Sequence, residues 1–298
     1  MKATVGLATV AIVVAACGQD RATSHQDDNG VSVVASTDVW GSVAGAVAGE
    51  HASVKSIETG VTADPHSYEA SPADAAAIAD ASLVVYNGGE YDHWVDDVLA
   101  SHPEVNAIEA YPLRADSESA NEHVFYDVRT AKAVAAVIAD RLGDIEPALA
   151  GDYRSNATEF GKLADAILES GRAIGRAHPS ASVVATEPVA YYLLRNAGIA
   201  DRTPPGFASA VAEGDDPPPA DVAAMLDLID SHQVSALLFN PQTETAATKQ
   251  IADAARRVAL PVVTVTETLP QGMDYLTWQR QTVEQLAGQL NKAPQANR

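Results

Sequence analysis

Two histidines and two acidic residues follow predicted strands, where ligand-binding residues of α/β proteins are usually found. In parallel sheets, ligands bind outside the carboxyl ends of the strands. The residues that meet this condition are His66, His123, Glu187 and Asp274. Imidazole nitrogens and carboxylate oxygens bind many divalent transition metals, so a cleft that joined the four side chains could hold one ion. Their spacing also allows the alternative that each is an ordinary surface or structural residue.

The four candidates are divided evenly between two halves of the chain. In chain order, the strands that precede them are predicted over Val54–Glu58, Asn106–Glu109, Ser182–Thr186 and Pro261–Val265. Glu187 directly follows its strand, whereas the other three lie farther along their loops. Two candidates from each half can meet only if the halves face each other across a cleft.

The stretch Glu146–Ala177, between these halves, is predicted to be one long helix. Pro147 suits a first helical turn, where its missing N–H costs nothing. Apolar residues then recur at spacings of three, four or seven: Leu149, Tyr153, Phe160, Leu163, Ile167 and Ile174. Roughly 30 residues make a helix of about 45 Å, which is longer than a small domain is wide. The pattern predicts a helix that joins two lobes, and an ordinary crossover helix within one domain is the alternative.

Predicted strands and helices alternate on both sides of this segment. Before it, strands are expected over Val31–Ser36, Val54–Glu58, Leu83–Tyr86 and Asn106–Glu109, and helices over Val39–Val47, Pro72–Ala79, Trp94–Ala100 and Val128–Leu142. After it, strands are expected over Ser182–Thr186, Ala236–Phe239 and Pro261–Val265, and helices over Val189–Asn196, Ala220–Ser231, Thr243–Val258 and Tyr275–Leu290. The connection Asp201–Pro219, rich in Gly, Pro and Asp, is expected to be irregular.

This alternation predicts an α/β fold with two lobes, each a parallel sheet flanked by helices. We expect an N-terminal lobe over residues 31–145, a rigid linking helix over 146–177, a C-terminal lobe over 178–298, and a ligand cleft between the lobes. A chain of 298 residues is long enough for two domains of ordinary size. The net charge of −21 argues against a nucleic-acid partner, whose phosphates need a basic face.

The N-terminus has the features of an export signal. Lys2 provides a short positive region, Val5–Val14 is apolar, and Cys17, the only cysteine, follows small residues. The run Val-Ala-Ala-Cys resembles a bacterial lipobox, in which the signal peptide is cut before a cysteine that then carries lipid. We therefore expect a signal peptide over residues 1–17, a lipid anchor on Cys17 and a polar, disordered tether over 18–30. A plain secretory signal with an incidental cysteine is the alternative.

Two motifs surround the predicted histidines: Asp-Pro-His-Ser-Tyr-Glu around His66 and Asn-Glu-His-Val-Phe-Tyr-Asp around His123. Together with the lipobox, they resemble the cluster-nine metal-binding receptors of bacterial ABC importers. The resemblance runs from about Val31 to Leu290 and includes Tyr86-Asn87-Gly88 with the downstream Trp94. It implies two α/β lobes joined by a long helix, with metal ligands on four loops, two from each lobe.

By motif and order, the resemblance places these ligands at His66, His123, Glu187 and Asp274. A carboxylate at Glu187 resembles the manganese and iron branches, because many zinc receptors have His there. The segment Ala110–Glu122 also lacks the His-rich loop of many zinc receptors. Carboxylates can bind bidentately and raise the coordination number, whereas zinc prefers four ligands, so Mn(II) or Zn(II) is the expected cargo.

The resemblance implies an extracytoplasmic solute-binding lipoprotein. We expect a monomer, anchored to the cell membrane through Cys17, that delivers its metal to an ABC permease and is not an enzyme. One rival is a secreted metallohydrolase, although no His-Glu-x-x-His or Gly-x-Ser-x-Gly motif is present in the sequence. The other is an adhesin or a receptor for an organic solute.

Overall fold

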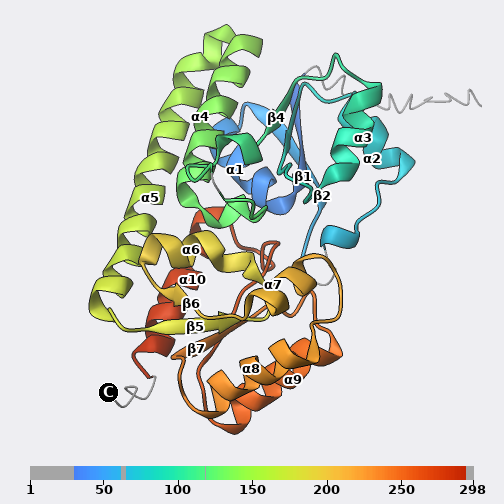
Figure 1. The fold of residues 1–298 in the computed structure, drawn as a ribbon. Coiled ribbons are helices and arrows are strands. Elements are labelled where there is room, and N and C mark those ends of the chain that lie inside the picture. Colours follow the sequence, from blue (N-terminus) through green and yellow to red (C-terminus); the bar gives the residue numbers. More distant parts are fainter. Residues whose placement is uncertain (1–29, 62–64, 118, 293–298) are drawn as a thin grey trace, which may run out of the picture.

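A computed structural model of the protein describes residues 30–61, 65–117 and 119–292. The predicted signal peptide, Cys17 and nearly all of the predicted tether lie outside these ranges. Figure 1 shows two α/β lobes, one above the other, with one long helix beside both. This arrangement confirms the predicted fold class.

The first lobe contains a four-stranded parallel sheet with the order β2-β1-β3-β4. Its strands are β1 (Val31–Thr37), β2 (Ala52–Glu58), β3 (Leu83–Tyr86) and β4 (Ala107–Glu109). Its helices are α1 (Asp38–Ala48), α2 (Pro72–Ala79), α3 (His93–Ser101) and α4 (Val128–Ile145). Three 3-10 turns complete the lobe, at Pro65–Ser67, Tyr111–Leu113 and Val124–Tyr126.

Alternate residues of these strands pack on opposite faces of the sheet, as a period of two requires. Val33 and Val85 belong to the core that includes α1 and α4. Val34 and Val84 lie in a separate cluster with Ile78 of α2 and residues of α3. The sheet is therefore covered on both faces, which explains why its inner strand β3 is entirely apolar and buried.

The second lobe repeats this arrangement with the strand order β6-β5-β7-β8. Its strands are β5 (Ser182–Ala185), β6 (Ala200–Asp201), β7 (Ala236–Phe239) and β8 (Val262–Thr264). Its helices are α6 (Tyr191–Ala197), α7 (Pro205–Ala212), α8 (Pro219–Asp230), α9 (Ala246–Arg257) and α10 (Tyr275–Leu290), and a 3-10 turn at Pro188–Ala190 precedes α6. Val184 and Leu237 face α7, α8 and α9. Val183 and Leu238 lie on the opposite face of the sheet, in the same core as residues of α1 and α4.

The prediction that Asp201–Pro219 is irregular was wrong. This segment contains α7, which begins at Pro205, a residue that is tolerated in a first helical turn. Phe207 is fully buried among apolar residues of α8, α9 and β7. Burial of this aromatic ring stabilises a short helix that composition alone did not indicate.

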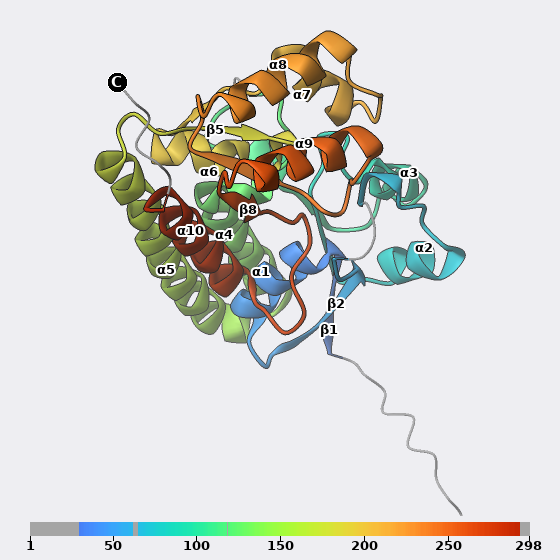
Figure 2. The ribbon, with the colours of Figure 1, turned by 90° about the horizontal axis from the view of Figure 1, so that it is seen from below.

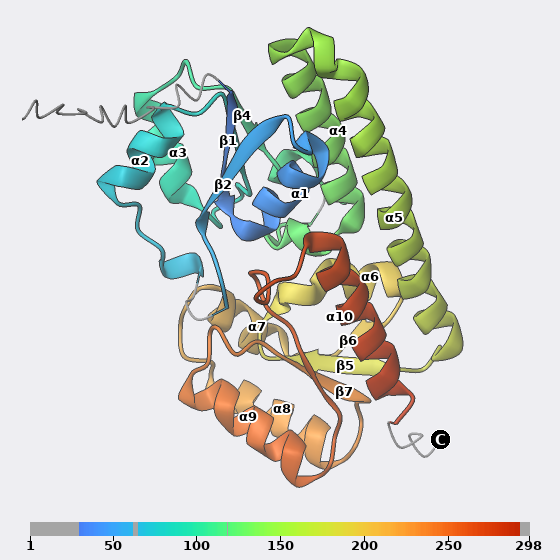
Figure 3. The same ribbon diagram turned by 180° about the vertical axis from the view of Figure 1, so that it is seen from behind.

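The long helix α5 (Ala150–Ala177) follows a 3-10 turn at Pro147–Leu149. Figure 3 shows it running along one side of the molecule, past both lobes, and Figure 2 shows α10 beside it, away from α2 and α3. At one end, the Asn156 amide donates to the Val47 carbonyl of α1 (3.0 Å). At the other end, a Cβ on Gly175 would lie 1.7 Å from the Ala197 carbonyl oxygen, so only glycine allows this approach to α6.

The two lobes also contact each other directly. The Tyr126 hydroxyl of the first lobe donates to the Thr266 carbonyl (2.9 Å), and the Tyr275 hydroxyl of α10 donates to the Phe125 carbonyl (2.7 Å). One continuous apolar core includes residues of both sheets and of α5. Among the helices in the described ranges, none combines the length and the apolar character that crossing a bilayer requires.

Candidate metal centre

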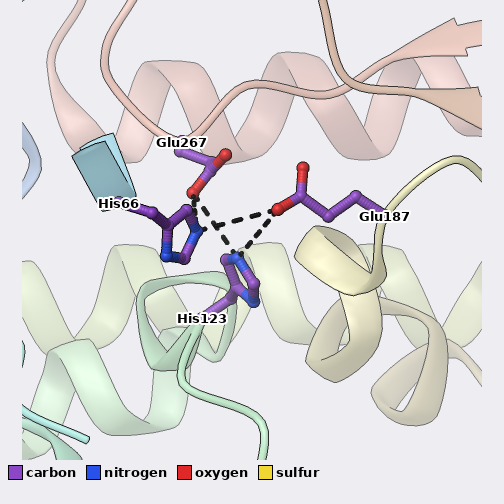
Figure 4. Close-up of side chains that lie close together, drawn as sticks. All are labelled: His66, His123, Glu187 and Glu267. Carbon is purple, nitrogen blue, oxygen red and sulfur yellow. Dashed lines mark ion pairs between the residues drawn. The ribbon is translucent and has the colours of Figure 1, made fainter. Parts of the chain in front are cut away.

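Four side chains converge between the lobes in an arrangement that could hold a metal ion. They are His66, His123, Glu187 and Glu267, and one ligand atom from each lies within 4.8 Å of the others. Figure 4 shows the two imidazoles and the two carboxylates pointing toward a common point from four separate segments. The histidines come from the first lobe and the carboxylates from the second, so the site spans the interface.

Each imidazole Nε2 lies within 4 Å of an oxygen of both carboxylates. Nε2 of His66 lies 3.0 Å from Oε2 of Glu267 and 3.7 Å from Oε1 of Glu187. Nε2 of His123 lies 3.4 Å from Oε2 of Glu267 and 3.9 Å from Oε1 of Glu187. Each imidazole therefore faces one oxygen of each carboxylate.

The site is enclosed on three sides. The side chains of His123, Glu187 and Glu267 are at most 3% exposed, whereas that of His66 is 27% exposed. A cavity of about 290 Å³ reaches His66 and Glu187 from the outside, and its walls include the acidic residues Asp215, Asp216 and Glu244. These carboxylates raise the local concentration of cations at the accessible edge.

Short local structures hold both histidines in place. His66 is the middle residue of the 3-10 turn Pro65–Ser67, and the backbone N–H of His123 donates to the Asn121 side chain (3.0 Å). The buried ring of Tyr91 packs edge-on against both imidazoles, at centroid distances of 4.9 and 5.9 Å. This packing limits the orientations of the two rings.

Two side chains in the loop after β7, those of Asn240 and Thr243, hold the carboxylates of Glu187 and Glu267 in place. The Asn240 side-chain amide donates to Oε2 of Glu187 (2.6 Å) and to Oε1 of Glu267 (2.7 Å). The Thr243 hydroxyl donates to the same Glu187 oxygen (2.5 Å). These bonds direct the remaining oxygen of each carboxylate toward the imidazoles.

Burial and mutual contact shift the pKa values of this group. Burial alone would lower the pKa of His66, but the hydrogen bond and charge of Glu267, with the charges of Glu187 and Glu122, raise it to about 9. The pKa of Glu187 is raised by burial and by the charge of Glu267. Although burial opposes it, contact with His123 and His66 holds the pKa of Glu267 well below its usual value.

His123 supplies independent evidence for a cation. Both of its ring nitrogens are buried and have no hydrogen-bond partner of acceptable geometry within the described ranges. Buried polar atoms without partners are rare and destabilising. A metal ion bound to Nε2 would satisfy one of them, so the donor set fits a divalent transition metal.

The structure brings His66, His123 and Glu187 together and places Asp274 outside this cluster. Asp274 is the N-cap of α10, where its carboxylate accepts from the Thr277 backbone N–H (2.9 Å) and hydroxyl (2.8 Å). Glu267 is the fourth side chain of the cluster. Two signals favoured Glu267: it lies nearer the end of a predicted strand, and an Asp just before a predicted helix is typical of an N-cap.

Comparison with known proteins also points to metal binding. A family model described as "Zinc-uptake complex component A periplasmic" matches residues 33–289. The manganese-binding lipoprotein MntA of Halalkalibacterium halodurans is 29% identical over 157 residues, which cover 51% of this chain and 52% of that protein. The match therefore spans only about half the length of this relative.

Solved structures match over nearly their whole length. The laminin-binding protein Lmb of Streptococcus agalactiae, described as bifunctional with adhesin and metal transporting activity, is 26% identical with a TM-score of 0.74, covering 88% of this chain and 99% of that one. The laminin-binding protein Lbp of Streptococcus pyogenes is 27% identical with a TM-score of 0.72 and the same coverage. The periplasmic zinc-binding protein TroA of Treponema pallidum shares the fold at 15% identity, with a TM-score of 0.72 over 89% of this chain and 99% of that one.

Proposed function

This chain belongs to the family of zinc-uptake complex component A periplasmic proteins, and we propose that it captures a divalent transition metal outside the cytoplasm and delivers it to the permease of an ABC importer. Members of this family are solute-binding transport proteins. Manganese and zinc are the candidate cargoes, because they are named for the relatives MntA and TroA.

The observation that carries this proposal is the ligand set between the lobes. Two imidazole nitrogens and two carboxylate oxygens from four segments lie within 4.8 Å of one another. Such a set suits a transition metal better than Ca²⁺ or Mg²⁺, which prefer oxygen ligands only. Its position at an interface between lobes is also typical of binding sites for small ligands.

We propose that the site binds the metal as cargo and does not use it for catalysis. A catalytic metal centre keeps an open coordination position for water or substrate. Here four protein atoms surround the site, and three of the four side chains are at most 3% exposed. Four protein ligands would leave no open position for water or substrate on a four-coordinate metal.

Attachment to the membrane is part of the proposal. The lipobox at Cys17 would place a lipid at the start of the mature protein, as in the relative described as a lipoprotein. The segment that follows, residues 18–30, would then act as a tether to the first lobe. Labelling of the expressed protein with a radioactive fatty acid, with and without Cys17→Ser, tests this part separately.

Elemental analysis of the loaded protein tests the proposed cargo. Protein stripped with a chelator, incubated with Mn(II) or Zn(II) and desalted should retain one ion per chain. His66→Ala and His123→Ala should lose it, because each removes a nitrogen ligand. His102→Ala is the matched control, since that histidine is 39% exposed and pairs with Glu104 away from the site. Absence of metal from the wild-type protein, or its retention by both variants, would refute the proposal.

A further inference from the structure

Asn240 occupies the position between the two carboxylates of the site. It directly follows β7, which lies between β5 and β8 in the sheet. Glu187 follows β5 and Glu267 follows β8, so the strand order places Asn240 between them. Its side chain is 1% exposed.

The orientation of the Asn240 amide is determined by its other contact. Its side-chain oxygen Oδ1 accepts from the backbone N–H of Gln242 (3.0 Å). Oδ1 therefore points away from the site, and Nδ2 faces the carboxylates. The two hydrogens of Nδ2 are then shared between Oε2 of Glu187 (2.6 Å) and Oε1 of Glu267 (2.7 Å).

These hydrogen bonds occupy one oxygen of each carboxylate. Oε2 of Glu187 accepts from both Asn240 and the Thr243 hydroxyl, and Oε1 of Glu267 accepts from Asn240. The oxygens that remain, Oε1 of Glu187 and Oε2 of Glu267, are the ones that face the imidazoles. Bidentate binding would require a metal to compete with these buried hydrogen bonds, which are strong because they involve a charged acceptor.

The spacing of the ligand atoms agrees with four-coordination. Zinc–ligand distances of about 2.0–2.1 Å place the ligands of a tetrahedral site about 3.3–3.4 Å apart. The four nitrogen–oxygen distances here are 3.0, 3.4, 3.7 and 3.9 Å, which bracket this value. The geometry differs from the expectation, based on the sequence, that the carboxylates raise the coordination number.

We propose that Asn240 is a positioning residue that restricts Glu187 and Glu267 to one metal-ligand oxygen each and thereby selects a four-coordinate metal. This inference rests on the proposed function and makes it more specific, because Zn(II) is stable with four ligands whereas Mn(II) favours more oxygen ligands. Asn240 acts on the metal only through the carboxylates. Its role is the selection of the ion, and the protein binds Zn(II) in preference to Mn(II).

Cobalt(II) absorption tests this inference, because four-coordinate Co(II) absorbs visible light much more strongly than six-coordinate Co(II). Wild-type protein loaded with Co(II) should give the strong spectrum. Asn240→Ala should lose most of this intensity, since the freed oxygens can bind as well. In competition titrations, the variant should bind Zn(II) roughly tenfold or more weakly. Its affinity for Mn(II) should fall less, so the Zn(II)-to-Mn(II) affinity ratio should decrease.

Asn196→Ala is the matched control, because this amide also donates to a carboxylate (3.0 Å), but that of Asp127, the N-cap of α4, which is not one of the four clustered side chains. It should keep the wild-type spectrum and ratio. Thr243→Val removes only the hydroxyl donor to Glu187 and should shift the spectrum and the affinity ratio in the same direction as Asn240→Ala. If Asn240→Ala does not fold, Thr243→Val tests the inference in its place.

Two different failures can be distinguished. A wild-type protein that binds no Co(II), Zn(II) or Mn(II) overturns the proposed function and this inference with it. A wild-type protein that binds these ions but gives the weak six-coordinate spectrum overturns the inference alone. The inference is also refuted if Asn240→Ala, or Thr243→Val in its place, keeps the wild-type spectrum and affinity ratio.

Discussion

Replacing a carboxylate with an amide, at Glu267 in one variant and at Asp274 in another, tests which of the two residues is the fourth metal ligand. Glu267→Gln keeps the size of the side chain but removes the charge that lies 3.0 Å from Nε2 of His66. Asp274→Asn makes the same chemical change at the N-cap of α10. Because Asn and Asp are equally good N-caps, this second variant should keep its helix and its metal site.

The expected size of the effect follows from linkage. A metal present at 100 times its dissociation constant raises the free energy of unfolding by about 2.7 kcal/mol. For a chain of this size, each kcal/mol corresponds to roughly 2–4 °C, so metal should raise the Tm of the wild-type protein by roughly 5–11 °C. Glu267→Gln should lose most of this rise, whereas Asp274→Asn should retain it.

Thermal unfolding with and without metal is the assay, and each variant is compared with itself. Asp274→Ala adds a control for stability: loss of the cap should lower the free energy of unfolding by about 1 kcal/mol in both the metal-free and the metal-bound protein. The assignment of Glu267 is refuted if Glu267→Gln keeps the full metal-dependent rise, or if Asp274→Asn abolishes it.

Three further predictions concern pH, packing and shape. Metal affinity should increase with pH by up to about tenfold per unit until about pH 9 and then level off, because the metal must displace a proton from His66, whose pKa is about 9; affinities that do not change between about pH 7 and 9 would contradict this. In urea unfolding, Gly175→Ala should destabilise by about 1–3 kcal/mol, because its Cβ would overlap the Ala197 carbonyl. Gly151→Ala, which meets nothing within 4 Å, should stabilise the same helix by about 0.4–1 kcal/mol, and equal effects would refute the packing argument. Solution scattering should give the same radius of gyration with and without metal, since α5 is continuous between the lobes; a large decrease on binding would show domain closure.

Most of the fold could be predicted because apolar periodicity reports burial directly. The bounds of β3 (Leu83–Tyr86) and α10 (Tyr275–Leu290) agree with the prediction to the residue. α7 was missed because its signal is a single buried ring, that of Phe207, within a segment of turn-forming composition. A contact that depends on the rest of the lobe leaves no periodic pattern in the local sequence.

Three of the four clustered side chains could be predicted because each lies in a loop after a strand of a parallel sheet. Glu267 also meets this condition, three residues after the end of β8, but the order of the motifs pointed to Asp274. Asn240 also directly follows a strand, but its position in the sequence does not reveal its partners. Its contact with both carboxylates depends on β7 lying between β5 and β8, and strand order is a property of the folded sheet.

The contacts between the lobes determine how a metal can reach this buried site. Separation of the lobes would break the bonds from the Tyr126 and Tyr275 hydroxyls, each worth about 1 kcal/mol, and would expose part of the continuous core. The side chain of His66 is 27% exposed, and the edge of the site at this residue opens into the acidic cavity. Entry along this edge would leave the contacts between the lobes intact, so we expect it to cost less free energy than opening the interface. The same contacts that hold the four ligands together therefore restrict exchange of the metal to one side of the site.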